Sequence, residues 1–459
     1  MTPRTRALKS ADRRPGYRCA DCGHQAAQWA GRCPACQAWG TLEQAAPAAR
    51  GARVAAGAPS APARRIADVE LDSARARPTG VEELDRVLGG GLVPGAVVLL
   101  AGEPGVGKST LLLEVAAKVA GAGKVLYVTG EESAGQVRLR AERTGAVHPE
   151  LYLAAESDLG AVVGHIDTVG PALLVVDSVQ TMSSGEVDGA PGGVTQTRAV
   201  TVALTALAKE RGLPVVLVGH VTKDGAIAGP RVLEHLVDVV LSFEGDKHST
   251  LRMVRGVKNR FGPADEVGCF ELRDEGIVGL RDPSGLFLDR LGGQGAPVPG
   301  TAVTIVMDGR RPLPAELQAL VAGKDIPSPR RAVSGLDNAR VAMLLAVLER
   351  RAGVRLHDSE VYAATVGGIR VVEPAADLAL AMAVTSARRD VALPPDLVVL
   401  GEIGLAGEVR RVAGVPRRLA EAARLGFTRA LVPPDSGPAP AGMSVQEVGD
   451  VALVLDRLR

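Results

Sequence analysis

The chain has 459 residues, 46% of them hydrophobic and 23% charged, so it has a globular composition and exceeds the length of a single small domain. Lys and Arg number 53 against 52 Asp and Glu, and the net charge of +1 excludes a global attraction to nucleic acid or membrane. No apolar run reaches the ~18 residues of a membrane span, and the basic residues 1–15 lead into no apolar signal segment. We therefore expect a cytoplasmic protein with no membrane partner.

Four of the five cysteines form two Cys-x2-Cys pairs near the start of the chain, Cys19 with Cys22 and Cys33 with Cys36. Two such pairs supply four thiolates to one closed tetrahedral site, which predicts a structural Zn²⁺ knuckle within residues 1–40. Disulfides or a redox-active pair are the alternative. These residues carry a net charge of +5, about +3 with a zinc tetrathiolate, which suits either a phosphate contact or a solvated tail.

The most informative segment is a Gly-rich loop that follows an apolar strand at residues 97–101 and precedes an apolar, helix-like stretch. It matches the pattern GxxxxGK(S/T) in the strand–loop–helix context that this pattern requires. Its backbone N–H groups bind the phosphates of ATP, Lys108 reaches the β- and γ-phosphates, and Ser109 holds Mg²⁺. The expected nucleotide-binding residues are Gly102, Glu103, Pro104, Gly105, Val106, Gly107, Lys108, Ser109 and Thr110.

Three further polar residues each close or follow an apolar strand. Asp177 is expected to assist Mg²⁺ as a Walker B acid, and its alternative is a turn-forming Asp. Glu131 follows a strand expected to neighbour the P-loop strand, where a carboxylate orients the attacking water; a helix cap is the alternative. His220 is expected to sense the γ-phosphate, unless it is simply a packed, hydrogen-bonded core residue.

Strands alternate with helix-like stretches between residues 67 and 285, which predicts a doubly wound, mostly parallel α/β sheet. Two Gly-rich loops, 181–195 and 222–230, leave the nucleotide end of this sheet. Such loops grip a polymer substrate or are plain surface connections.

Segments 79–111, 130–133 (GEES) and 173–181 resemble the RecA/DnaB/KaiC class of ATPases. The four-Cys knuckle together with KNRFG at 258–262 is similar to the RadA (Sms) family of bacterial DNA repair proteins, and the resemblance covers nearly the whole chain. It implies a DNA-dependent ATPase, a DnaB-type helicase-like motor that works with RecA on single-stranded and branched DNA. It also implies branch migration of recombination intermediates by a hexameric ring.

The same resemblance implies roles for Lys258 and Arg260. In DnaB-like helicases a K-x-R element at the end of a late strand reaches the nucleotide of the neighbouring subunit. A cation supplied in this way stabilises charge on the γ-phosphoryl group and couples hydrolysis to subunit movement. Without the resemblance, two basic residues beside a turn are ordinary surface charge.

The pattern changes after residue 301, and segments 372–380, 401–410 and 415–433 resemble the proteolytic domain of Lon. That family uses a Ser nucleophile activated by a Lys. The matching positions here are Ala375 and about Pro416, so we expect an inactive α+β domain that serves as a scaffold or a DNA-contact surface.

Five arginines of this domain form a basic cluster that binds duplex phosphates or is a solvated helix face: Arg410, Arg411, Arg417, Arg418 and Arg424. Aromatic residues make up only 2% of the chain, so few side chains are available to stack on bases. Binding of single strands is therefore expected to be mostly electrostatic.

The expected organisation is a zinc knuckle at 1–40, an Ala/Pro/Gly/Arg-rich flexible linker at 41–66, a RecA-like ATPase domain at 67–285 and a Lon-like domain at 286–459. Two functions compete with the DNA motor. One is a KaiC-like regulatory ATPase that never touches DNA. The other is a Lon-like peptidase, which the missing Ser and Lys disfavour.

Overall fold

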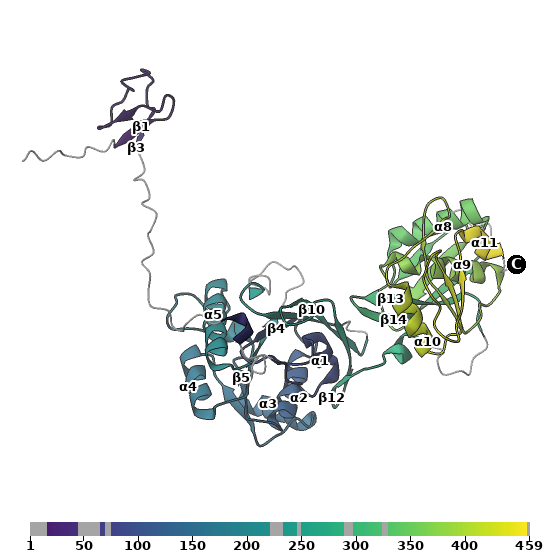
Figure 1. Ribbon diagram of the computed structural model, residues 1–459, viewed down its shortest axis with the longest axis horizontal. Coiled ribbons are helices and arrows are strands. Elements are labelled where there is room, and N and C mark those ends of the chain that lie inside the picture. Colours follow the sequence, from purple (N-terminus) through teal and green to yellow (C-terminus); the bar gives the residue numbers. More distant parts are fainter. Residues whose placement is uncertain are drawn as a thin grey trace, which may run out of the picture. The chain divides into compact units, whose positions relative to one another are not determined.

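The computed structural model describes residues 16–44, 65–68, 75–220, 233–245, 249–288, 297–323 and 329–456 (Figure 1). The chain divides into two compact units, Met1–Val69 and Glu70–Arg459. The basic residues 1–15, most of the expected linker and the loop at 222–230 lie outside the described residues. Each unit has a hydrophobic core of its own.

The first unit contains a small antiparallel sheet in the order β2–β1–β3. The strands of this sheet are β1 (Tyr17–Cys19), β2 (Gln25–Ala26) and β3 (Leu42–Gln44), and the unit also contains the 3-10 turn η1 (Ile66–Asp68). Strand β3 pairs with β1 and places Leu42 opposite Cys19. The folded knuckle therefore extends to Gln44, past the boundary at residue 40 expected from sequence, because a third strand completes its sheet.

Within the described residues, the ATPase domain has a nine-stranded sheet in the order β12–β11–β10–β9–β4–β8–β7–β5–β6. The six strands from β9 to β6 are parallel, and β10, β11 and β12 extend the sheet antiparallel. The strands are β4 (Val97–Gly102), β5 (Val125–Thr129), β6 (Leu151–Ala155), β7 (Leu173–Asp177), β8 (Val215–His220), β9 (Val239–Gly245), β10 (Leu251–Asn259), β11 (Val267–Arg273) and β12 (Gly276–Gly279).

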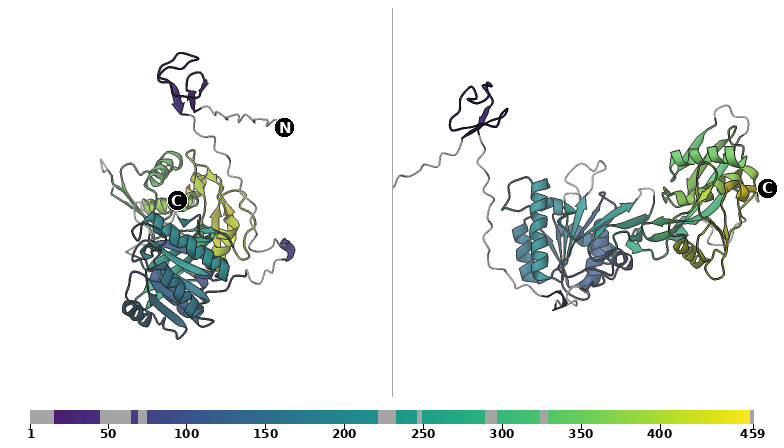
Figure 2. Two further views of the ribbon diagram at one scale, coloured as in Figure 1. Left: turned by 90° about the vertical axis from the view of Figure 1, so that its left-hand side faces the viewer. Right: turned by 45° about the horizontal axis from the view of Figure 1, so that its top comes forward.

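Helices pack against both faces of this sheet, as Figure 2 shows. Alternate residues of β4 enter different cores: Val98 and Leu100 pack with α1, α2 and α3, and Val97 and Leu99 with α4 and α5. This is the expected doubly wound architecture. The helices are α1 (Glu82–Leu88), α2 (Lys108–Ala120), α3 (Ala134–Arg143), α4 (Leu159–Val169), η3 (Val179–Thr181) and α5 (Val194–Arg211).

The strand order corrects one expectation. Strand β5, which precedes Glu131, does not neighbour the P-loop strand β4, because β8 and β7 lie between them. The connections from β4 to β5, from β6 to β7 and from β8 to β9 pass over intervening strands, whereas β5–β6 and β7–β8 are direct neighbours, so the chain forms one edge with β5 and β6 before it returns to the middle of the sheet for β7 and β8. His220, at the end of β8, is therefore the predicted polar residue whose strand adjoins β4.

The Lon-like domain combines a mixed seven-stranded sheet, in the order β15–β16–β14–β13–β17–β20–β21 over the part the structure describes, with helices. This is the expected α+β class. Its strands are β13 (Thr301–Asp308), β14 (Arg311–Ala322), β15 (Arg331–Ser334), β16 (Glu360–Thr365), β17 (Leu397–Val399), β18 (Glu402–Ile403), β19 (Val409–Arg410), β20 (Arg429–Val432) and β21 (Ser444–Glu447). Its helices are α7 (Ser284–Phe287), α8 (Asn338–Ala352), η4 (Pro374–Ala376), α9 (Asp377–Arg389), α10 (Val415–Arg424) and α11 (Val451–Leu455).

The ATPase and Lon-like domains share packing within the second unit. Leu251 and Cys269 of the ATPase sheet belong to the same core cluster as the residues of β14 and α9. Burial raises the pKa of the Cys269 thiol to about 11. Arg311 of β14 forms a buried ion pair with Glu83 of α1, so the two domains meet through both apolar and charged contacts.

No helix among the described residues combines the length and the apolar character that a bilayer crossing requires.

Candidate functional site

The loop between β4 and α2 has the conformation expected of a phosphate-binding loop. Gly105 and Gly107 have φ of 78° and 113°, left-handed conformations that glycine adopts without the strain of a side chain. Gly107 is the N-cap of α2, and Lys108 begins the helix. The first N–H groups of a helix have no partner within it and attract anions, so residues 102–110 fit the triphosphate of a nucleotide.

The side chain of Lys108 lies at the mouth of this loop and is 4% exposed. Its Nζ donates to the carbonyl oxygens of Gly102 and Glu103, both at 2.9 Å, and lies 3.2 Å from Nδ1 of His220. Burial lowers the pKa of Lys108, and the charges of Asp177 and Glu131 oppose that shift. The backbone of the loop thus orients the Lys108 ammonium group, which is predicted to bind the same phosphates as the loop.

His220 and Glu131 continue this chain of contacts. The register of β4 and β8 places His220 opposite Gly102, and Nε2 of His220 lies 3.1 Å from a carboxylate oxygen of Glu131. Because the Lys108 ammonium only donates, Nδ1 of His220 accepts its hydrogen bond, and Nε2–H of His220 donates a hydrogen bond to the Glu131 carboxylate. The structure therefore brings Lys108, His220 and Glu131 together although they come from three different strand ends.

The alternative in which Glu131 caps a helix does not fit the structure. The side chain of Ser133 caps α3, in a capping box with Gln136. The neighbouring Glu132 pairs with Arg140 on α3. Glu131 instead accepts a hydrogen bond of 2.5 Å from the Ser178 hydroxyl and faces His220.

Asp177 ends β7 and is 7% exposed. Its carboxylate accepts a hydrogen bond of 2.6 Å from the Tyr127 hydroxyl, and burial together with the charge of Asp177 raises the pKa of Tyr127 well above its ordinary value. The hydrogen bond from Tyr127 fixes one carboxylate oxygen of Asp177. In P-loop enzymes Mg²⁺ is bound by a carboxylate at this edge of the sheet and by a hydroxyl at the start of the following helix, the positions that Asp177 and Ser109 have here.

Sequence reasoning missed the residues that hold these groups in place: Tyr127, Ser178 and Arg252. Arg252 on β10 is 7% exposed and donates from Nε to the carbonyl oxygen of Val106 at 3.1 Å. These residues carry no local motif. Their contacts depend on which strands are neighbours, which the sequence alone did not provide.

Lys258 and Arg260 lie at the other end of the sheet. Lys258 Nζ donates to the carbonyl oxygens of Glu234 (2.6 Å) and Val237 (2.8 Å), and burial lowers its pKa. Arg260 donates to Asp238 at 3.0 Å, and Asp238 also accepts from the backbone N–H of Val97, the first residue of β4. Both cations are therefore at the edge opposite the P-loop, which follows the last residue of that strand.

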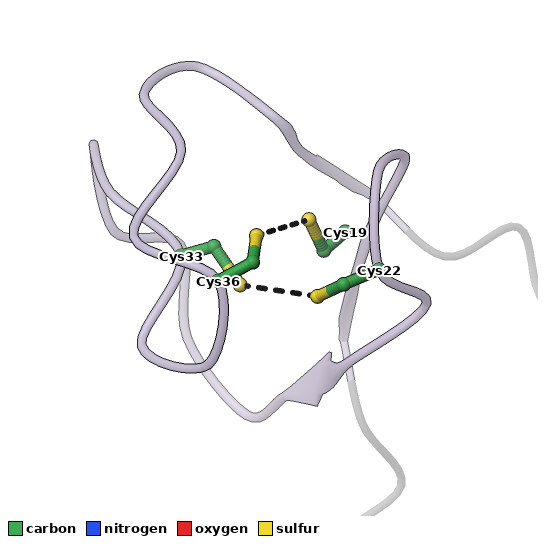
Figure 3. A group of neighbouring side chains, drawn as sticks. All are labelled: Cys19, Cys22, Cys33 and Cys36. Carbon is green, nitrogen blue, oxygen red and sulfur yellow. Dashed lines mark hydrogen bonds between the residues drawn. The ribbon is translucent and has the colours of Figure 1, made fainter.

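The four N-terminal cysteines form one cluster (Figure 3), with all sulfur atoms within 4.8 Å of one another. The Sγ atoms of Cys19 and Cys36 are 3.7 Å apart, as are those of Cys22 and Cys33. Zinc–sulfur bonds of about 2.3 Å in a tetrahedron place sulfur atoms about 3.8 Å apart. The cluster thus fits Zn²⁺, and all five cysteines are free thiols rather than disulfides.

Loss of zinc is expected to unfold the knuckle and leave the ATPase domain folded. Within residues 16–44, the described part of the knuckle, the core contains only Cys19, Cys33 and Leu42, with Tyr17 and Ala26 packed against it, so we expect its folding to depend on the metal. Wild-type protein should contain one zinc per chain by metal analysis, Cys33→Ser should contain almost none, and both should show the same thermal transition of the ATPase domain. Cys269→Ala is the control that keeps its zinc. Full zinc content in Cys33→Ser would contradict the assignment.

The Lon-like domain lacks the chemistry of a peptidase at the matching positions. Ala375 lies buried in η4, and Pro416 lies in the first turn of α10. Close by in sequence, Arg418 is buried and forms a two-pronged ion pair with Glu373, and Glu373 also accepts from the backbone N–H of Met307. A structural ion pair therefore lies beside the two positions where the Lon family has its dyad.

The basic cluster of this domain is largely neutralised by its own acidic neighbours. Arg410 pairs with Glu402 and Glu408, Arg411 with Asp435, and Arg424 with Glu421 and Asp282. Arg417 donates to the carbonyl oxygen of Arg310. Paired arginines offer little free charge to phosphates, so this cluster is a weaker DNA-contact candidate than the sequence alone indicated.

Comparison with known proteins agrees with this three-part organisation. Models of a rubredoxin metal binding domain, an AAA domain and the ChlI subunit of Mg-chelatase match residues 17–44, 60–226 and 367–436, respectively. The chain is 58% identical to the DNA repair protein RadA of Mycolicibacterium smegmatis over 97% of both chains. It is 57% identical to that of Mycobacterium tuberculosis, over 97% of this chain and 93% of the relative, and 44% identical to that of Streptococcus pyogenes serotype M1, over 97% and 99%. With its four-cysteine metal site, ATPase domain and Lon-like C-terminal domain, the chain belongs to the RadA family of DNA repair proteins.

Proposed function

We propose that this chain is an ATP-driven DNA motor in homologous recombination. It hydrolyses ATP in response to single-stranded and branched DNA and drives branch migration of recombination intermediates together with RecA, as a hexameric ring of the DnaB helicase type. The relatives named DNA repair protein RadA support the process. Zinc would hold the knuckle, and Mg²⁺ would accompany the ATP.

The observation that carries the proposal is the contact chain from Lys108 through His220 to Glu131. Lys108 stabilises negative charge on the phosphates, and Asp177 with Ser109 holds Mg²⁺, which neutralises the phosphoryl oxygens when bound. Glu131 accepts a proton from, and orients, the attacking water. His220 contacts both groups, so a γ-phosphate that binds Lys108 would compete for its contact with His220, and His220 would thereby sense the nucleotide.

The placement of Lys258 and Arg260 supports a role in a neighbouring subunit. Arg260 is bound to Asp238, which is bound to Val97 at the start of β4, whereas the P-loop follows the end of that six-residue strand. Such a strand spans about 17 Å. Neither cation is near the P-loop of its own chain, and a nucleotide held by an adjoining copy is the partner that fits the K-x-R resemblance.

The test is steady-state ATP hydrolysis with and without single-stranded DNA at fixed salt. Wild-type protein should be stimulated, and Arg260→Ala should bind ATP normally but lose about 10³-fold in stimulated rate, the loss typical for a missing arginine finger. Arg273→Ala, which removes an exposed arginine paired with Glu271 on β11, is the matched control and should retain its rate.

A mixing experiment separates action in a neighbouring subunit from a fold defect. Lys108→Ala and Arg260→Ala, each inactive alone, should recover partial activity when mixed, because the former donates an intact Arg260 to the intact P-loop of the latter. No recovery would contradict the proposed role of Arg260. ATP hydrolysis that ignores DNA at low salt would favour a KaiC-like regulatory ATPase instead.

A further inference from the structure

The zinc knuckle displays both tryptophans of the chain. Trp29 lies between the two cysteine pairs and is 62% exposed, and Trp39 follows the second pair and is 76% exposed. Tryptophan is highly buried on average, so two such side chains on one small module are unusual. The low aromatic content of the chain had indicated few surfaces on which bases could stack, and the structure gathers its two largest ones here.

Neither tryptophan contributes to the core of the knuckle. That core consists of Cys19, Cys33 and Leu42, with Tyr17 and Ala26 packed against it. A large aromatic side chain that is exposed and unnecessary for folding is typical of a contact residue, because burying it against a partner removes much apolar surface from water.

The ring of Trp39 is oriented by its neighbours. The guanidinium carbon of Arg32 lies 5.8 Å from the ring centroid, and Arg32 is held by a 2.7 Å hydrogen bond from its Nε to the carbonyl oxygen of Gln37. The backbones of Arg32 and Trp39 form a β-bridge, and the ring lies beside Gly31. An oriented ring loses less conformational entropy when it binds, and the adjacent cation suits an anionic partner.

The sequence on either side of the knuckle is strongly basic. Residues 1–15 contain five Lys or Arg and one Asp, and residues 45–65 contain four Arg and no acidic residue. Stacking surfaces flanked by positive charge match single-stranded nucleic acid, which exposes unpaired bases on an anionic backbone. An acidic or apolar protein surface would satisfy only one of these two features.

We propose that Trp29 and Trp39 stack on unpaired bases of single-stranded DNA, so that the zinc knuckle is a base-binding module. This inference rests on the proposed function, because it takes DNA as the partner of the protein. Its readout is independent of ATP hydrolysis, because all tryptophan emission of the chain comes from these two residues.

The experiment titrates the full-length, zinc-loaded protein with three oligonucleotides of equal length at fixed salt. A thymidine oligomer should quench and shift tryptophan emission. An abasic oligomer with the same number of phosphates and a blunt duplex should leave the emission nearly unchanged, because neither offers an unpaired base. Equal quenching by the thymidine and abasic oligomers would overturn the proposal, since phosphate contacts alone would then account for the signal.

Variants make the same test on affinity. Trp29→Ala and Trp39→Ala should each weaken binding of the thymidine oligomer about tenfold, and Trp→Phe at either site should largely restore it because a phenyl ring still stacks. Zinc content shows whether each variant is folded. Leu139→Ala, which removes a 68%-exposed apolar side chain from α3, is the control that should bind normally.

Two outcomes separate this inference from the motor function. DNA-stimulated ATP hydrolysis without quenching would overturn the stacking role and leave the motor intact. Quenching by the thymidine oligomer without any stimulation of hydrolysis would support the stacking role and count against the motor. If the Trp→Ala variants bind DNA normally but no longer bind RecA, the tryptophans form a protein contact and the proposal is wrong.

Discussion

Lys108→Ala should lower the rate of ATP hydrolysis by about 10²–10³-fold, as expected when one preorganised donor to the phosphoryl group is lost. The Lys108 ammonium is buried, fixed by two carbonyl oxygens of its own loop and in contact with His220. Alanine removes the charge and also leaves those carbonyl oxygens without their donor. Steady-state phosphate release with saturating Mg²⁺ and ATP is the measurement.

The matched control is Lys118→Ala on the same helix. Lys118 is exposed, pairs with Glu114 and donates to the carbonyl oxygen of Gly80, away from the P-loop. It should hydrolyse ATP at the wild-type rate. Equal losses in both variants would mean that α2 tolerates neither change and that Lys108 has no special function.

Glu131→Gln should reduce hydrolysis by about 10²–10⁴-fold while ATP still binds, because glutamine keeps the shape of the side chain but cannot accept a proton from water. Binding is measured with a fluorescent ATP analogue, and hydrolysis by single-turnover phosphate release. A protein that binds ATP and retains it is the expected signature of a lost general base.

Glu132→Gln provides the comparison one residue along. Its carboxylate pairs with Arg140 on α3 rather than with His220, so it should lose little activity. The reverse result, with Glu132 essential and Glu131 dispensable, would show that Glu132 is the general base. It would overturn the interpretation of the Lys108–His220–Glu131 contacts.

Local sequence patterns predicted the parts of this protein that depend on neighbouring residues. The P-loop motif places its glycines, a lysine and a hydroxyl within nine consecutive residues, between a strand and a helix. The structure has this strand, loop and helix at 97–120. The two cysteine pairs were equally informative, because four thiolates at that spacing have few other uses. In both patterns, the spacing of residues close together in the sequence determines the geometry of the site.

Features that depend on distant parts of the chain were predicted less well. Glu131 was singled out on the argument that its strand adjoins β4, and that argument was wrong. The residue nevertheless reaches past the end of β7 to His220, whose strand β8 is the one that lies next to β4. Strand order arises from crossover connections that no local pattern records. The arginines of α10 looked like a free basic surface for the same reason, since Glu373, the partner of Arg418, is 45 residues away.

Strand β10 contacts two different places of chemical importance. Near its start Arg252 donates to the carbonyl oxygen of Val106 in the P-loop, and at its other end stand Lys258 and Arg260. In the proposed ring, one short strand would join the nucleotide of its own subunit to that of the next. Binding of a nucleotide in one subunit would then shift β10 and, through it, the cations that contact the nucleotide of the next subunit. Hydrolysis would proceed in order around the ring rather than at random.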